Sequence, residues 1–124
     1  MKGRIVIVDD NPAGARLAAY VLECEGFAVK VADRPENGLE LIREWRPDLV
    51  LMDLQLPGIS GLELTRLLKA DENTAGIVIV ALSAYVRLED RDQAQDAGCD
   101  GFIAKPIDTR AFPAQVASFL EKPL

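Results

Sequence analysis

The stretch Ile5-Val6-Ile7-Val8-Asp9-Asp10 decides the fold, because an apolar run ends directly in two acids. The same arrangement recurs along the chain: Asp53 follows the apolar run 49–52, Ser83 follows 77–82, and Lys105 follows 102–104. Short runs that are apolar at every position are typical of strands buried on both faces of a parallel sheet. Open α/β sheets bind ligands at the carboxyl ends of their strands, where the strand order reverses. We therefore expect these five side chains to converge on one site.

Strand-like and helix-like segments alternate along the chain, which predicts five βα units. With a further strand at 28–31, the expected fold is α/β: a doubly wound, five-stranded parallel sheet of flavodoxin-like (βα)5 type, in the order 2-1-3-4-5. Start and stop residues predict the helix ends. The first helix begins after Asn11 and stops at Gly26, and the second runs from Pro35 to before Pro47. Ser60 and Glu63 form a capping box that opens the third helix. The fourth helix covers 87–97, and the fifth begins near Asp108 or Thr109.

Helical spacing predicts which side chains face the core. They are Ala18, Val21 and Leu22 in the first helix, Leu39, Ile42 and Trp45 in the second, Leu64, Leu67 and Leu68 in the third, and Phe112, Val116, Phe119 and Leu120 in the fifth. The fourth helix offers only Leu88, Ala94 and Ala97 among many charges, so we expect it to bury little area and to be the mobile element. Pro113 in the first turns of the fifth helix departs from typical helix chemistry.

Composition limits the function further. The 124 residues suit one domain spanning 1–124, and 14 Lys and Arg against 20 Asp and Glu leave a net charge of -6, which argues against nucleic-acid binding. Cys24 and Cys99 lack metal-type spacing, as expected of reduced thiols in a cytoplasmic protein. The apolar run after Met1 is too short for a signal peptide or a membrane span, so we expect a soluble protein.

Asp9, Asp10 and Asp53 would repel one another at one sheet edge, by roughly 4 kcal/mol for each pair at about 4 Å, and such a cluster attracts a cation. Ligands that offer only oxygen suit Mg²⁺. Ser83 and Lys105 could contact a phosphoryl group that the Asp53 carboxylate attacks. Each residue alone has a commoner role, as a loop acid, a strand-end hydroxyl or a surface lysine, and only their joint placement favours this site. The chain contains no histidine, so any phosphohistidine belongs to a partner.

Four motifs carry a resemblance along the whole chain: Val-Asp-Asp-Asn at 8–11, Met-Asp-Leu-Gln-Leu-Pro-Gly-Ile-Ser-Gly at 52–61, Leu-Ser-Ala at 82–84 and Phe-Ile-Ala-Lys-Pro at 102–106. With them the chain resembles the receiver domain of bacterial two-component response regulators, the CheY-like superfamily. The resemblance implies that Asp53 accepts phosphate, that Asp9, Asp10, Asp53 and the Gln55 backbone carbonyl organise Mg²⁺, and that Ser83 and Lys105 hold the phosphoryl group. It also implies a cis bond between Lys105 and Pro106. The stretch 98–107 further resembles stand-alone DivK-type regulators, which have no output domain.

The resemblance also implies a switch, in which the Ser83 hydroxyl and the Phe102 ring move together, although Phe102 could be an ordinary core aromatic. Gln55 and Tyr85 would flank the phosphoryl group. Neither is an acid that activates water, so we expect slow self-dephosphorylation, and Tyr85 could instead simply pack on the loop. The implied partners are a histidine kinase or histidine phosphotransfer protein, and a downstream protein bound by the face of the fourth helix, fifth strand and fifth helix.

Three other classes remain open. A phosphatase of the haloacid dehalogenase class also uses magnesium and an acyl phosphate, but its nucleophile lies in an Asp-x-Asp after the first strand. A flavodoxin-type flavin module needs phosphate-binding donors after the first strand, where this chain has Asp9 and Asp10. A degenerate receiver would act only as a docking module, yet this chain retains the acids, Ser83 and Lys105.

Overall fold

Five parallel strands form one sheet in the order β2-β1-β3-β4-β5, as the sequence predicts. The structure is a computed structural model that describes residues 2–55, 60–84 and 87–120. The strands are β1 (Arg4–Val8), β2 (Ala28–Ala32), β3 (Leu49–Asp53), β4 (Val78–Ser83) and β5 (Gly101–Ala104). Every residue of β3 and β4 is buried, which explains why their sequences are apolar at successive positions.

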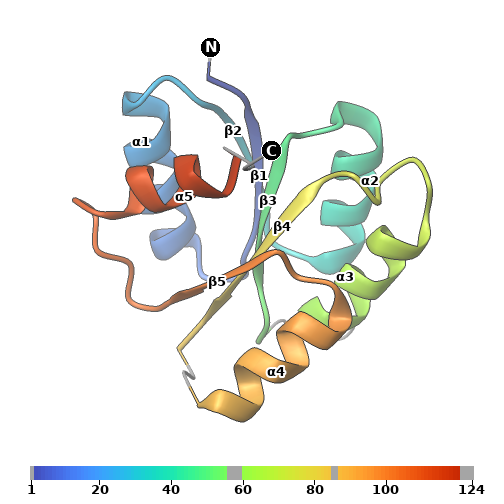
Figure 1. Ribbon diagram of the computed structural model, residues 1–124. Helices are drawn as coiled ribbons and strands as arrows, with labels where there is room; N and C mark the ends of the chain where they lie inside the picture. The colour runs from blue at the N-terminus through green and yellow to red at the C-terminus, as the bar shows by residue number, and fades with distance from the viewer. Residues whose placement is uncertain (1, 56–59, 85–86, 121–124) are drawn as a thin grey trace.

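Helices cover both faces of this sheet (Figure 1). They are α1 (Pro12–Cys24), α2 (Pro35–Trp45), α3 (Gly61–Ala70), α4 (Leu88–Ala97) and α5 (Phe112–Leu120). α1 and α5 lie on one face, and α2, α3 and α4 lie on the other (Figure 1). Side chains alternate between the faces along a strand, so Ile5 and Ile7 belong to the core under α1 and α5, while Val6 and Val8 belong to the core on the opposite face.

Several helix ends agree with the predicted signals. Asn11 caps α1, because its side-chain oxygen accepts the N–H of Gly14 at 3.2 Å. α2 ends at Arg46, which is left-handed (φ 52°) and immediately precedes Pro47. Ser60 Oγ accepts the N–H of Glu63 at 3.2 Å, as expected for the first half of a capping box.

The predicted inner face of α3 is wrong at Leu67, whose exposed fraction is 50%. Leu64 and Leu68 are buried, and Thr65 takes the remaining inward position. A threonine is tolerated there because its hydroxyl donates to the carbonyl of Gly61 at 2.8 Å, which satisfies the buried polar atom.

α4 buries only Ala94 and Ala97, and Leu88 at its start is 74% exposed. This agrees with the prediction that α4 buries little area. Cys99 and Cys24 are both free thiols, as expected.

α5 begins at Phe112, later than predicted from Asp108 or Thr109. The carbonyl of Asp108 accepts the N–H groups of Ala111 and Phe112 at 3.0 and 2.8 Å, so a separate turn precedes the helix. Pro113 therefore falls in the first helical turn, where a missing N–H costs no helical hydrogen bond, and its presence needs no special explanation. The Lys105–Pro106 bond is cis, as predicted. Within the described ranges, no helix combines the length and apolarity that crossing a membrane requires.

Candidate functional site

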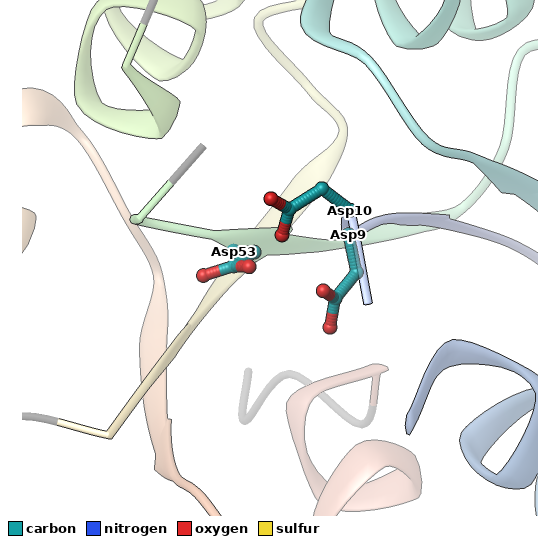
Figure 2. A group of neighbouring side chains, drawn as sticks. All are labelled: Asp9, Asp10 and Asp53. Atoms are coloured by element: carbon teal, nitrogen blue, oxygen red, sulfur yellow. The ribbon is translucent and has the colours of Figure 1, made fainter. Parts of the chain in front are cut away.

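Asp9, Asp10 and Asp53 lie together at the carboxyl edge of the sheet (Figure 2). β1 and β3 are neighbours with Val8 beside Met52, so the residues that follow these two positions meet at the same level. Each acid places one carboxylate oxygen so that the three oxygens lie within 4.8 Å of one another. The edge at which they meet adjoins the point where the strand order reverses, between β1 and β3.

Asp9 is 4% exposed and is held from two sides. Its Oδ1 accepts the backbone N–H of Asn11 at 2.9 Å, and its Oδ2 accepts a hydrogen bond from Lys105 Nζ at 3.0 Å. Asp10, by contrast, is exposed. Asp9 is therefore buried and held by hydrogen bonds, whereas Asp10 is accessible to solvent.

Asp53 is 3% exposed at the end of β3. Its Oδ1 accepts the backbone N–H of Gln55 at 2.9 Å, and its Oδ2 lies 3.3 Å from Lys105 Nζ. Lys105 thus bridges Asp9 and Asp53, two acids from separate strands.

Burial and charge act in opposite directions on these groups. Burial raises the pKa of Asp53, and although the Gln55 N–H and the Lys105 charge oppose this, the net shift is upward, with nearby Asp9 adding to it. Burial alone would lower the pKa of Lys105, but its hydrogen bond to Asp9 and the charges of Asp53 and Asp9 raise that pKa above its ordinary value. The ammonium therefore stays charged at neutral pH, while ionised Asp53 is costly to keep buried.

Ser83, at the end of β4, is fully buried, and its hydroxyl is hydrogen-bonded to the side chain of Gln55. Gln55 Nε2 donates to Ser83 Oγ at 3.0 Å, and Ser83 Oγ lies 3.3 Å from Gln55 Oε1. The sequence placed both residues near the site but did not predict that they pair. Their separation of 28 residues leaves no local pattern that could have revealed it.

Gly61 is a site residue whose role no local sequence pattern predicts. A Cβ atom at this position would lie 2.3 Å from the carbonyl oxygen of Asp53 and 3.1 Å from the Cα of Leu54. The first residue of α3 therefore packs directly against the backbone of Asp53. Glycine is needed because of this close approach, and it determines how far α3 stands from the site.

The donor set fits a divalent cation. The candidate ligands are carboxylate oxygens, which Mg²⁺ prefers. Among the described residues, the three carboxylates are offset by one ammonium, that of Lys105, so the cluster carries excess negative charge. Exposed Asp10 leaves room for the water ligands that Mg²⁺ usually keeps. Gln55 follows Asp53 closely enough for its N–H to bond that carboxylate, and the metal role of its carbonyl stays a prediction.

A cavity of about 320 Å³ adjoins the acid cluster on the side of α1. Asp9 and Lys105 line its polar end, and its walls include Leu17, Leu82 and Ile107. The Lys105 side of the site therefore opens into a largely apolar recess.

Of the two remaining predicted residues, one lies apart from the acid cluster and the other is not among the described residues. Phe102, in β5, is half-buried, and its ring contacts Arg91 of α4, with the guanidinium carbon 5.2 Å from the ring centroid. Tyr85 lies outside the described residues.

Comparisons with known proteins agree with this geometry. The family model for the response regulator receiver domain matches residues 5–117. The polar-differentiation response regulator DivK of Brucella anthropi is 38% identical over 123 residues, covering 97% of this chain and 98% of the relative. DivK of Brucella ovis is 36% identical over 120 residues, with the same coverage.

Solved structures give the same result. A CheY-like response regulator receiver domain protein from Methanospirillum hungatei JF-1 has a TM-score of 0.85 at 32% identity, over 94% of this chain and 92% of that one. The signal receiver domain of a histidine kinase from Syntrophus aciditrophicus has a TM-score of 0.86 at 27% identity, over 95% and 89%. From its sequence and its fold, this chain belongs to the response regulator receiver domain family of two-component signal transduction.

Proposed function

We propose that this protein accepts a phosphoryl group on Asp53 from a partner phosphohistidine in a Mg²⁺-dependent reaction, and that the modification changes its affinity for other proteins. The observation that carries the proposal is the position of Asp53: it is buried and lies among Asp9, Asp10 and Lys105 at the sheet edge. A solvated loop acid would not need both a backbone N–H and a bridging ammonium to hold its carboxylate.

In the transfer step, a lone pair of an Asp53 carboxylate oxygen forms the new O–P bond while the P–N bond to the donor imidazole breaks. The imidazole nitrogen keeps the electron pair of that bond and takes up a proton. The N–H of Gln55 holds Oδ1 at 2.9 Å, which orients the carboxylate before the donor arrives. The donor imidazole lies outside this chain, which has no histidine.

Lys105 and Ser83 act on the phosphoryl oxygens. The Lys105 ammonium lies 3.3 Å from Asp53 Oδ2, so it is placed to stabilise negative charge on a group attached to that carboxylate. The Ser83 hydroxyl, one residue beyond the register partner of Asp53, can donate to the same group after leaving Gln55.

Asp9, Asp10, Asp53 and the Gln55 backbone carbonyl would hold the Mg²⁺ ion. Once bound, the ion supplies positive charge that offsets the repulsion between the acids and the anionic donor. The chain's own contribution is to hold Asp9 through Asn11 and Lys105, so that the ligands are in place beforehand.

The switch we propose begins at Ser83. When the hydroxyl turns to the phosphoryl group, Phe102 rotates inward beside it and α4 repacks. α4 suits this role because only Ala94 and Ala97 of its residues are buried. The altered face, formed by α4, β5 and α5, would then bind a downstream protein rather than nucleic acid, in keeping with the net charge of -6.

We further propose a long-lived phosphoryl group. Gln55 and Tyr85 take the two positions that we expect beside it, and neither side chain is an acid that could activate water. The catalysis is therefore limited to the protein's own phosphorylation and slow dephosphorylation, which suits a signalling protein more than an enzyme with external substrates.

The test is to incubate the protein with acetyl phosphate, with and without Mg²⁺, and to weigh it intact. We expect one labile phosphoryl group that requires Mg²⁺ and is absent from Asp53→Asn. Steady release of phosphate from many donor molecules without a phosphorylated protein would indicate a phosphatase instead, and no labelling would indicate a docking module.

A further inference from the structure

The two halves of α4 are held differently. In the C-terminal half, Ala94 and Ala97 are buried, and the helix ends at Gly98, whose N–H and that of Cys99 bond to helical carbonyls. In the N-terminal half, positions 88–93 include no buried residue. The C-terminal half therefore resists displacement more strongly than the N-terminal half.

The segment that follows α4 is fixed firmly to the sheet. Asp100 Oδ2 accepts the N–H of Ile79 at 2.9 Å and pairs with Lys69 Nζ at 2.8 Å. Lys69 Nζ also donates to the carbonyl of Ile77 at 2.8 Å. Any large movement of α4 must therefore occur at its N-terminal end, which is also the end nearer to Ser83 along the chain (Figure 1).

One side-chain contact joins that N-terminal half to the proposed switch residue. The guanidinium carbon of Arg91 lies 5.2 Å from the centroid of the Phe102 ring, within the range of a cation–π interaction. Among the described residues, the ion pair at this end, Arg87 with Asp90 at 3.2 Å, stays within the helix start and does not reach the sheet.

The Phe102 ring also has space around it. It lines a recess of about 210 Å³ together with Arg91, Gln95 and Cys99. Its register partner on β4 is Ala81, whose small side chain points to the same side of the sheet. Arg91 is exposed whereas Ala81 is fully buried, so inward rotation of the ring takes its face away from the guanidinium.

We propose that Arg91 is a positioning residue of the switch: its contact with Phe102 holds the N-terminal half of α4 on β5 in the unphosphorylated protein, and rotation of Phe102 breaks that contact. This proposal rests on the proposed function, because phosphorylation of Asp53 is what drives the rotation. The consequence is that one guanidinium couples an aromatic side chain to a helix whose buried residues, in the part of the chain that the structure describes, lie in its C-terminal half.

Amide hydrogen exchange of the full chain tests this without any partner. In unphosphorylated Arg91→Met, which keeps an unbranched stem but removes the guanidinium and its charge, amides 91–93 should exchange about 2- to 5-fold faster than in wild type. Amides 95–98 should be unchanged, and Arg91→Lys should show an intermediate rate. In a Phe102→Leu background, Arg91→Met should add nothing, because the ring is already missing.

Comparing exchange rates before and after phosphorylation distinguishes a switch role of Arg91 from a purely structural one. In wild type labelled with acetyl phosphate and Mg²⁺, amides 91–93 should speed up to the rate of Arg91→Met, and the two proteins should no longer differ. A uniform increase along α4, or an equal difference before and after labelling, would overturn the role of Arg91. Absence of labelling by intact mass would instead overturn the phosphoacceptor assignment, so the two failures are distinguishable.

Discussion

The side-chain amide of Gln55 donates to the hydroxyl of Ser83 at 3.0 Å, across two neighbouring strand ends. The backbone N–H of the same Gln55 holds the Asp53 carboxylate at 2.9 Å. The main chain of Gln55 therefore orients Asp53, the proposed phosphoacceptor. Its side chain is hydrogen-bonded to the Ser83 hydroxyl, which we propose binds the phosphoryl group. To bind the phosphoryl group, the Ser83 hydroxyl must give up its hydrogen bond to Gln55.

Gln55→Ala should therefore speed labelling by acetyl phosphate, because it removes the competing side chain and keeps the backbone N–H. A neutral hydrogen bond contributes about 0.5–1.5 kcal/mol, so we expect an initial rate about 2- to 10-fold higher. The measurement is a time course of intact mass. In a Ser83→Ala background the same change should have no accelerating effect, and slower labelling of Gln55→Ala in the wild-type background would contradict the competition.

Mg²⁺ should stabilise the wild-type protein, by about 2.7 kcal/mol at a concentration one hundred times its dissociation constant. Asp10→Ala should lose most of this gain while unfolding normally without metal, because Asp10 is exposed and lies outside the Lys105 bridge. Glu72→Ala, which removes an exposed acid elsewhere, is the matched control. Urea unfolding with and without Mg²⁺ checks the prediction, and equal stabilisation of Asp10→Ala would remove Asp10 from the ligand set.

Gly61→Ala should destabilise the fold by about 1–3 kcal/mol, since its Cβ would lie 2.3 Å from the Asp53 carbonyl oxygen. It should also slow labelling, because relief of the clash displaces the backbone that carries the acceptor. Gly76→Ala is the control: no atom lies within 4 Å of its Cβ position, so its stability should change by less than about 1 kcal/mol. Equal stability of the two variants would mean that α3 can shift without cost.

The pKa of Asp53 is raised by burial, so the folded protein holds this proton more tightly than the unfolded chain does. Below the ordinary carboxyl pKa of about 3.9, both states are protonated and the group contributes nothing. As the pH rises through the folded-state pKa, ionisation of the buried acid lowers the free energy of unfolding. Without divalent cation, Asp53→Asn should therefore be more stable than wild type at pH 7, and the difference should shrink near pH 4. Chemical unfolding at both pH values measures this, and a less stable Asp53→Asn at pH 7 would contradict it.

The parallel sheet and the convergence of the acids could be predicted because both follow from simple patterns. Apolar runs at successive positions mark buried parallel strands, and a polar residue after each run must lie at the same sheet edge. Asn11 before Pro12 likewise predicts the start of α1, because an N-cap depends only on a hydrogen bond between residues close in sequence.

Other features depend on contacts between distant segments, which local patterns do not contain. The buried side of α3 includes Thr65 and not Leu67, and Thr65 is tolerated there because its hydroxyl donates to the Gly61 carbonyl. The Gln55–Ser83 pair and the Arg91–Phe102 contact likewise join residues from different βα units. The start of α5 was misplaced because a turn at Asp108 uses the same side-chain chemistry as a helix cap.

Whether Asp53 forms an acyl phosphate is tested by locating the modification in the labelled protein. Protein labelled with acetyl phosphate and Mg²⁺ is treated with borohydride, which reduces an acyl phosphate of aspartate to homoserine, and is then analysed by peptide mass spectrometry. We expect homoserine at position 53 alone, dependent on both the donor and Mg²⁺. Reduction at Asp9 or Asp10, or a labile phosphoryl group that persists in Asp53→Asn, would contradict it.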